Sequence, residues 1–564
     1  MPAAHGPEGI GAATHSRPEP AGRHLQAPQS AVLDEAHLGD IEGAFGRVSV
    51  GDVGERRSWG RRLLTFAAIM GPGLIVMVGD NDAGGVSTYA QAGQNYHTSL
   101  LWTLILLIPV LIVNQEMVVR LGAVTGVGHA RLINERFGKG WGWFSVGDLF
   151  LLNFLTIVTE FIGISLAASY AGISDYVAVP VAAAALVAIM ASGSFRKWER
   201  AMFIFIAISV VQVPLLFLSH PQWGTIGRNF VVPGIYGGTT SASVLLIIAI
   251  VGTTVAPWQL FFQQSNIVDK RITPRFISYE RADTVMGSIV VVVGAACIMV
   301  AGDYAARNTK AFGNFTNAAG VAHLLAKHSQ VLGDLFAILL FDASIVGAAA
   351  VTLSTSYAFG DVFGIRHSLH RNFADAKQFY LSYTAMVALA AGIVLIPGAP
   401  LGLITTSVQA LAGLLLPSAS VFLLLLCNDR EVLGPWVNAA WLNALASIII
   451  AVLLVLSGTL MATTLFPNID VTAVFVYLTV ALAVVGAGIA LAVRVTSRRQ
   501  NGAEKVGVPQ ITQAEKLSWR MPPLALLKPV RWSPGLRVGI LSLRGYLVLS
   551  AVLLLVKAIQ LGGG

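Results

Sequence analysis

The chain has 564 residues, of which 55% are apolar and only 12% are Asp, Glu, Lys or Arg, about half the charged share of a soluble domain. So few charged residues cannot cover a water-soluble protein of this size, which excludes a soluble enzyme and a nucleic-acid binder. Cys297 and Cys427 lie far apart in apolar runs, so no disulfide framework or CxxC metal site is available. At roughly 20 residues per span, the apolar excess suffices for about twelve membrane-spanning helices.

Composition along the chain divides it into four parts. Residues 1–60 lack periodicity and an apolar signal segment, which predicts a disordered cytoplasmic tail. A transmembrane transporter domain of about twelve helices is expected over 61–495, a basic cytoplasmic segment over 496–544, and a short apolar helix over 545–564 that either spans the membrane or lies on its surface. The predicted spans are 63–93 (interrupted), 98–119, 142–171, 177–193, 201–219, 241–268 (interrupted), 283–302, 332–362, 379–396, 402–427, 435–457 and 471–493.

The basic residues predict the orientation of these spans. If the N-terminus is cytoplasmic, the inner loops before the last span carry twenty Lys and Arg residues and the outer loops carry four, as expected when basic residues gather on the cytoplasmic side. The net charge of +8 therefore indicates contact with an anionic inner leaflet rather than with nucleic acid. We expect a multi-pass protein of the inner (plasma) membrane, and the sequence assigns no oligomeric state.

The first span is interrupted by acidic residues and glycines. Asp80, Asn81 and Asp82 precede Ala83, Gly84 and Gly85 at mid-span. Buried carboxylates beside a glycine pair are too costly for an ordinary lipid-facing helix, so the backbone is expected to unwind where it lines a cavity. We expect Asp80 to face away from Asp82 or to bond to the turn, because two adjacent free carboxylates repel each other.

The sixth span is interrupted by Pro257. Proline removes a backbone donor and pushes Ala256 out of the helical region, which frees the carbonyl of Thr253 and its neighbours. Interrupted helices at corresponding places of two five-helix halves indicate an inverted-repeat transporter with its site at the membrane midplane. Because the predicted spans contain no basic residue to neutralise Asp82, a cation is favoured over an anion as the substrate.

At these residues the sequence resembles the NRAMP family of divalent metal transporters. Its first-span pattern, GPGF then DPGN then QAG, matches GPGL from Gly71, Asp82–Gly85 and Gln91–Gly93. Further matches are QEMVVRLGAVTG from Gln115, TEFIG from Thr159, FRKWE from Phe195, GTTVAPW from Gly252 and VQALAGLLLP from Val408. The resemblance implies an all-α, LeuT-type inverted repeat of five plus five helices, with extra C-terminal helices and with helices 1 and 6 broken.

The resemblance also implies a metal site between the two broken helices. Its ligands correspond to the Asp82 carboxylate, the backbone carbonyls of Gly79 and Thr253, and the Gln409 amide. Two family ligands are replaced, because Gly85 stands for the Asn of DPGN and Ala256 stands for the sixth-span Met.

These replacements remove a soft thioether and leave only oxygen donors, which suit Mg²⁺ with several waters retained. The sequence is most similar to the NRAMP-related magnesium transporter branch, and we expect Mg²⁺, with Mn²⁺ also carried, as the transported ion and no other cofactor.

The residues that the family uses for protons differ here as well. Trp258 and Ile157 replace a His and an Asp, no histidine falls inside a predicted span, and only Glu160 of the third span remains. We therefore expect uncoupled transport driven by the ion gradient and the membrane potential. The alternatives are a proton-coupled Mn²⁺/Fe²⁺ transporter, an amino-acid or organic-cation carrier of the same fold, and a membrane receptor that does not transport.

Two other residues within the predicted spans are candidates for a role. Asp342 is expected either to make a helix contact or to face the ion pathway. Met77 is expected to pack against neighbouring helices.

Overall fold

The computed structural model describes residues 34–52, 54–398, 401–466, 468–500, 512–528 and 530, and isolated positions between 541 and 552. The helices of the first half are α1 (Trp59–Ile69), α2 (Pro72–Val78), α3 (Ala83–Tyr96), α4 (Leu101–Thr125), α5 (His129–Phe137), α6 (Lys139–Tyr170), α7 (Asp175–Met190), α8 (Phe195–Ile208), α9 (Gln212–Leu218) and α10 (Trp223–Val231). Those of the second half are α11 (Ser241–Thr254), α12 (Pro257–Asp269), α13 (Ile277–Ala306), α14 (Ala318–His328), α15 (Gln330–Phe363), α16 (Lys377–Val394), α17 (Leu401–Cys427), α18 (Arg430–Leu433), α19 (Ala440–Leu465), α20 (Val471–Gln500) and α21 (Gln513–Ser518).

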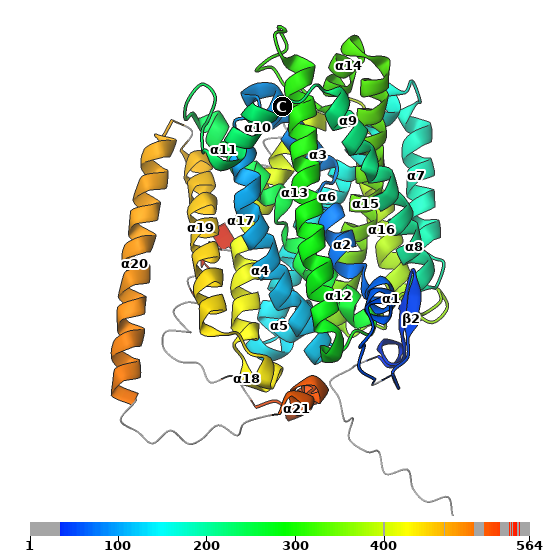
Figure 1. The fold of residues 1–564 in the computed structure, drawn as a ribbon, viewed down its shortest axis with the longest axis vertical. Helices are drawn as coiled ribbons and strands as arrows, with labels where there is room; N and C mark the ends of the chain where they lie inside the picture. Colours follow the sequence, from blue (N-terminus) through cyan, green and yellow to red (C-terminus); the bar gives the residue numbers. More distant parts are fainter. Residues whose placement is uncertain are drawn as a thin grey trace, which may run out of the picture.

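Short 3₁₀ segments and one hairpin complete the described structure. The 3₁₀ segments are η1 (Glu35–His37), η2 (Ser209–Val211), η3 (Pro274–Phe276), η4 (Gly434–Trp436) and η5 (Leu524–Leu526). The hairpin consists of the antiparallel strands β1 (Ile41–Gly43) and β2 (Gly46–Val48), with Ile41 opposite Val48. The fold is therefore an all-α helical bundle, as the sequence predicted, with a small hairpin at one end (Figure 1).

Each of the twelve predicted spans coincides with a helix or a pair of helices, except the first, which coincides with α1, α2 and α3. Within the described ranges nine helices are long and apolar enough to cross a membrane, or ten if the bent pair α1–α2 counts as one span. The shorter α7 and α16 correspond to the predicted spans 177–193 and 379–396, whose crossing of the membrane stays a prediction. Helix α13 packs against α2, α3 and α4, while α15 packs against α6; α20 stands at the edge of the bundle beside α19 (Figure 1).

The first span contains a bend as well as the predicted break. Helices α1 and α2 meet at 54° around Gly71, whose φ of 148° favours glycine. Pro72 then occupies the first turn of α2, where its missing N–H costs nothing. The predicted break follows at residues 79–82, between α2 and α3, and the second predicted break separates α11 from α12 at Val255 and Ala256.

The prediction of disorder over residues 1–60 is wrong for residues 34–52. Ile41 and Val48 are buried against the bundle, the Ala44 N–H donates to Glu199 Oε2 at 2.5 Å, and Asp34 forms an ion pair with Arg371. The segment has too few apolar residues to fold alone, and contacts with distant helices supply the rest. Residues 1–33 lie outside the described part.

The C-terminal boundaries also shift. Helix α20 continues to Gln500, so the basic segment expected from 496 begins after that helix. Part of this segment is docked on the bundle: the Met521 N–H donates to the Val124 carbonyl at 3.3 Å, and Arg136 Nη1 donates to the Lys528 carbonyl at 2.7 Å. Most of the predicted helix 545–564 lies outside the described residues. Both cysteines are free and buried, as expected.

Candidate metal-binding site

Asp82 lies at the start of α3, where the first span is broken. Its carboxylate caps the helix by accepting a hydrogen bond from the Gly85 N–H at 2.6 Å, and the residue is 2% exposed. The N-terminal end of a helix carries partial positive charge, which stabilises a carboxylate that has no basic partner. The sequence forms this cap because Asp is among the residues preferred at a helix N-cap, and Ala83, Gly84 and Gly85 form the first turn of α3 behind it.

Glu160 of α6 reaches the same helix end. Its Oε2 accepts the Ala83 N–H at 3.1 Å, its carboxyl group contacts that of Asp82, and its Oε1 is buried without a hydrogen-bond partner. Gly347 of α15 makes the approach possible, since a Cβ there would lie 2.6 Å from Glu160 Oε2 and 2.8 Å from the Asp82 Cβ. The structure therefore brings Glu160 into the predicted site, and Gly347 is a site residue that the sequence analysis missed.

The space above Gly85 is lined by oxygen atoms. A Cβ at Gly85 would lie 2.7 Å from the Asp80 carbonyl oxygen, 3.4 Å from Asp82 Oδ1 and 3.4 Å from Thr253 Oγ1. Thr253 Oγ1 is buried and accepts or donates no hydrogen bond among the described residues. Because Gly85 has no side chain, three oxygen atoms meet around it. The Asp82 carboxylate and the Asp80 carbonyl come from the first span, and the Thr253 hydroxyl comes from the sixth.

Backbone carbonyls at the two breaks lose their usual helical partners. The N–H groups of Ala83 and Gly85, which would bond to the carbonyls of Gly79 and Asn81 in a continuous helix, donate to carboxylates instead. Pro257 has no N–H to offer the Thr253 carbonyl. The carbonyls of Gly79 and Thr253 therefore lack these helical donors, and their role as ligands stays a prediction.

Gln409 of α17 closes the site from a third direction. It is 2% exposed, its amide lies directly over Gly84, and its Nε2 has no partner within the described structure. Rotating the amide by 180° exchanges its oxygen and nitrogen, so Gln409 can present an oxygen to a cation at the same place. Gly84 leaves the room that this side chain occupies.

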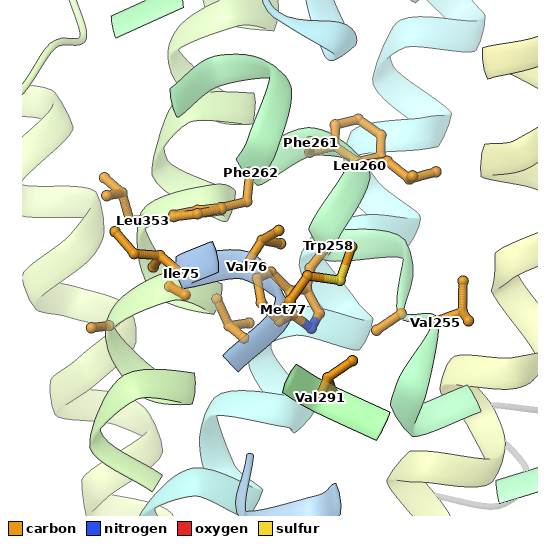
Figure 2. Packing of buried hydrophobic residues seen from close by; sticks show 14 of the residues in the cluster. Ile75, Val76, Met77, Val255, Trp258, Leu260, Phe261, Phe262, Val291 and Leu353 are labelled. Atoms are coloured by element: carbon orange, nitrogen blue, oxygen red, sulfur yellow. The ribbon is translucent and has the colours of Figure 1, made fainter. Parts of the chain in front are cut away.

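The two remaining lining residues flank the second break. Ala256 precedes α12 in an extended conformation and is 5% exposed. Its methyl group occupies little space and offers no donor atom to a cation. The Trp258 ring is buried and approaches the Cβ position of Gly79 at 3.3 Å. Figure 2 shows Trp258 in one apolar cluster with Met77 of α2 and Phe262 of α12. This cluster borders the break with apolar side chains.

Asp80 does not bond within its own turn. Its Oδ1 accepts from Gln259 Nε2 of α12, and Gln259 Oε1 in turn accepts from Gln115 Nε2 of α4 at 3.1 Å. Of the two expected alternatives, the hydrogen bond from Asp80 to the turn is not formed, because a donor on the other broken helix takes its Oδ1. Polar Gln115 and Gln259 inside apolar segments are the sequence signal that would have identified this network.

Other intramembrane candidates lie apart from the site. Asp342 Oδ2 accepts from Ser209 Oγ at 2.7 Å, a contact between α15 and the 3₁₀ segment η2. Met77 packs on α13, where its Sδ lies 3.9 Å from Ser288 Oγ, as expected. No cluster of three or more His, Cys, Asp or Glu side chains suited to a metal occurs in the described ranges. A cation at the breaks would therefore be held largely by carbonyl, hydroxyl and amide oxygens around Asp82.

Comparisons with known proteins point to one family. The family model described as natural resistance-associated macrophage protein-like (Nramp) matches residues 73–463. The chain is 27% identical over 416 residues, 70% of its length, to the divalent metal cation transporter MntH of Ralstonia nicotianae, of which 89% is covered. It is 24% identical over 459 residues, 76% of its length, to MntH of Bacillus subtilis, of which 95% is covered.

The fold is similar to that of a solved transporter. The crystal structure of the Eremococcus coleocola manganese transporter, in complex with an aromatic bis-isothiourea substituted compound, superposes with a TM-score of 0.57 at 21% identity. The match covers 80% of this chain and 99% of that one.

Proposed function

The chain belongs to the natural resistance-associated macrophage protein-like (Nramp) family, and from that premise we propose that it transports divalent metal cations across the plasma membrane. The observation that carries the proposal is the group of unpartnered buried oxygens around Asp82, which no described Lys or Arg neutralises. The relatives named as divalent metal cation transporters support the substrate class. The protein is a transporter and not an enzyme.

We propose Mg²⁺ as the preferred ion, with Mn²⁺ also carried. Gly85 and Ala256 replace the side chains that would offer an amide and a thioether, so every donor around Asp82 is an oxygen. Hard oxygen donors favour Mg²⁺ over softer ions, and a site with few side chains leaves room for the waters that Mg²⁺ retains. An amino-acid carrier would instead offer its helix N-termini to the carboxylate of its substrate. Here the Asp82 carboxylate already caps the N-terminus of α3, which disfavours an amino acid as the substrate.

We propose further that transport is not coupled to protons. Trp258 and Ile157 are apolar and buried at the positions where the resembling family places a His and an Asp, and uptake is then driven by the gradient and by an inside-negative potential, worth roughly 2.3 kcal/mol per charge per 100 mV. We propose a cytoplasmic N-terminus on the distribution of the basic residues. A proton-coupled Mn²⁺ transporter is the second candidate, and the contact between Glu160 and Asp82 favours it.

The test is ion flux into proteoliposomes that contain an internal pH dye. We expect Mg²⁺ to enter, Mn²⁺ to enter and compete with it, and the internal pH to stay constant. Asp82→Ala is expected to abolish flux, whereas the matched control Asp334→Ala, an exposed acid at the start of α15, is expected to keep it. Failure of Mg²⁺ to enter or compete would refute the magnesium assignment, and acidification driven by Mn²⁺ or Mg²⁺ would refute uncoupled transport.

A further inference from the structure

Two carboxylates of the first break face different walls of the bundle. Asp82 faces Glu160 of α6 and Gly347 of α15, whereas Asp80 is bound by Gln259 of α12. The break therefore presents one carboxylate on each side, and only Asp82 corresponds to a ligand of the resembling family.

Each of these carboxylates is associated with the N-terminal end of a broken half-helix. Asp82 caps α3, and Asp80 is tied through Gln259 to the first turn of α12, a helix of 13 residues. Both helix ends carry partial positive charge, which stabilises a carboxylate without a basic residue. Gln259 Nε2 also donates to the Thr254 carbonyl at 3.2 Å, so the same side chain fixes Asp80 to both halves of the sixth span.

The Asp80 carboxylate keeps one oxygen available. The residue is 0% exposed, and its Oδ2 has no hydrogen-bond partner among the described residues. Glu199, by contrast, is paired with Lys270. Other buried acids, among them Glu160 and Asp342, also keep an oxygen without a partner, so Asp80 is distinguished by its place at the break. A buried charged oxygen left without a partner is costly, and that cost disappears when a cation or its bound water occupies the break.

We propose that Asp80 is a second, specificity-determining carboxylate of the cation site, which binds the water shell of the divalent metal while Asp82 binds the metal itself. The inference rests on the proposed function, since it assumes that a divalent cation occupies the break. Two carboxylates match the charge of a divalent ion, and removing one of them weakens the attraction for a divalent ion twice as much as for a monovalent ion. Mg²⁺ keeps several waters when bound, so a carboxylate beyond direct contact still recognises it.

Asp80→Asn is the sharpest test because Asn keeps the oxygen that accepts from Gln259 and removes only the charge. In proteoliposomes we expect the KM for Mg²⁺ to rise about tenfold or more, with the maximal rate within about twofold of the wild type. Asp80→Glu is expected to restore most of the affinity. Calorimetric titration of the purified variant with MgCl₂ should show the same loss, and a purely structural role would leave both constants unchanged.

Gln259→Met tests the positioning of Asp80 and Gln263→Met is its matched control. Gln263 lies one turn further along α12, is equally buried and donates to Thr284 Oγ1 at 2.9 Å, away from the break. We expect the KM for Mg²⁺ to rise about threefold or more in Gln259→Met and to stay unchanged in Gln263→Met. If Asp80→Asn does not accumulate in the membrane, this pair decides the question.

The outcomes separate the inference from the proposed function. A wild-type protein that moves neither Mg²⁺ nor Mn²⁺ refutes the proposed function and with it the inference. A wild-type protein that moves Mg²⁺, combined with an unchanged KM in Asp80→Asn or equal KM values in Gln259→Met and Gln263→Met, refutes the role of Asp80 alone. A raised KM that Asp80→Glu reverses supports it.

Discussion

At the scale of single residues, Gly85 shows how closely the backbone atoms of the first break approach one another. A side chain at this position would press its Cβ against the Asp80 carbonyl oxygen at 2.7 Å, a separation that real Cβ atoms do not adopt. Replacing Gly85 by Asn therefore changes the turn as well as the donor set. Ala256 lies in extended backbone before α12 and can accept a longer side chain without such a clash in its own backbone, which makes it the better position for testing ion selectivity.

Ala256→Met is expected to raise the preference for Mn²⁺ over Mg²⁺ about fivefold or more, because a thioether is a soft ligand that binds Mn²⁺ better than Mg²⁺. The measurement is the ratio of the two KM values in proteoliposomes. Ala256→Leu has nearly the same volume without the sulfur and serves as the control. Equal ratios in the Met and Leu variants would contradict the ligand argument and leave only an effect of size.

His129 gives the protein a defined response to pH. Burial lowers the pKa of this side chain to about 4, and its Nδ1 lies 2.9 Å from Gln264 Oε1. The unfolded chain takes up the proton near pH 6.5 whereas the folded protein does not. The free energy of unfolding therefore falls as the pH drops from 6.5 towards 4, by about 2 kcal/mol between pH 7 and pH 5.

His129→Asn is expected to remove this contribution, because Asn offers a donor near the position of Nδ1 but does not titrate. Thermal unfolding of the purified protein at pH 7 and pH 5 measures the difference. The wild type should lose more stability than the variant over this interval. Identical losses in both proteins would show that His129 is not the responsible group.

At the scale of elements, the two breaks have different causes. The first depends on side chains, since the carboxylates of Asp82 and Glu160 take the N–H groups that a continuous helix would use. The second depends on the backbone, since Pro257 cannot donate to the Thr253 carbonyl. Both deprive backbone carbonyl oxygens of their helical donors, and such carbonyls are the groups that coordinate cations at the broken helices of transporters.

Pro257→Ala is expected to lower the affinity for Mg²⁺ several-fold, because Ala supplies an N–H that can bond to the Thr253 carbonyl and continue the helix. The KM for Mg²⁺ flux and the thermal midpoint together measure the effect. Pro180→Ala, at a proline inside α7 and outside the site, is the control and should leave the KM unchanged. A wild-type KM in Pro257→Ala would mean that the Thr253 carbonyl is not a ligand.

The sequence predicted both breaks but not the bend between α1 and α2. Polar and helix-breaking residues inside long apolar runs are visible in the sequence at Asp82 and Pro257. The bend at Gly71 depends on Asp283 of α13, whose Oδ2 accepts the N–H groups of Gly71, Gly73 and Leu74 at 3.0, 2.8 and 3.2 Å. A contact across more than 200 residues leaves no local pattern.

At the scale of the whole molecule, a buried ion pair joins several distant segments. Lys270, after α12, is 0% exposed, lies 2.5 Å from Glu199 Oε1 of α8 and donates to the Met70 carbonyl at 2.8 Å. Glu199 also accepts from Ala44 in the β1–β2 turn. Lys270 lies on the predicted cytoplasmic face but is enclosed there, because the N-terminal hairpin and the α1–α2 bend cover it.

Lys270→Met is expected to destabilise the protein by about 3–5 kcal/mol, because it leaves the buried Glu199 charge without a partner. Lys270→Met combined with Glu199→Gln should recover part of this loss, since Glu199 then carries no charge. Thermal unfolding of the purified proteins is the measurement. Arg57→Met, which breaks the exposed pair with Glu55, is the control and should change stability by about 1 kcal/mol or less. Equal effects of the two single substitutions would contradict a buried pair.

The sequence by itself determined the membrane fold and the places of the two breaks, and it singled out Asp82 as the candidate ligand, because apolar run length, proline and acidic residues within apolar runs are local properties of the chain. Only the tertiary structure decided which side chains complete the site. Gly347, Gln115 and Gln259 come from helices distant in sequence, and their contribution depends on distances across the bundle. The ordering of residues 34–52 was decided in the same way, since a hairpin this short is stable only on a surface that the rest of the chain provides.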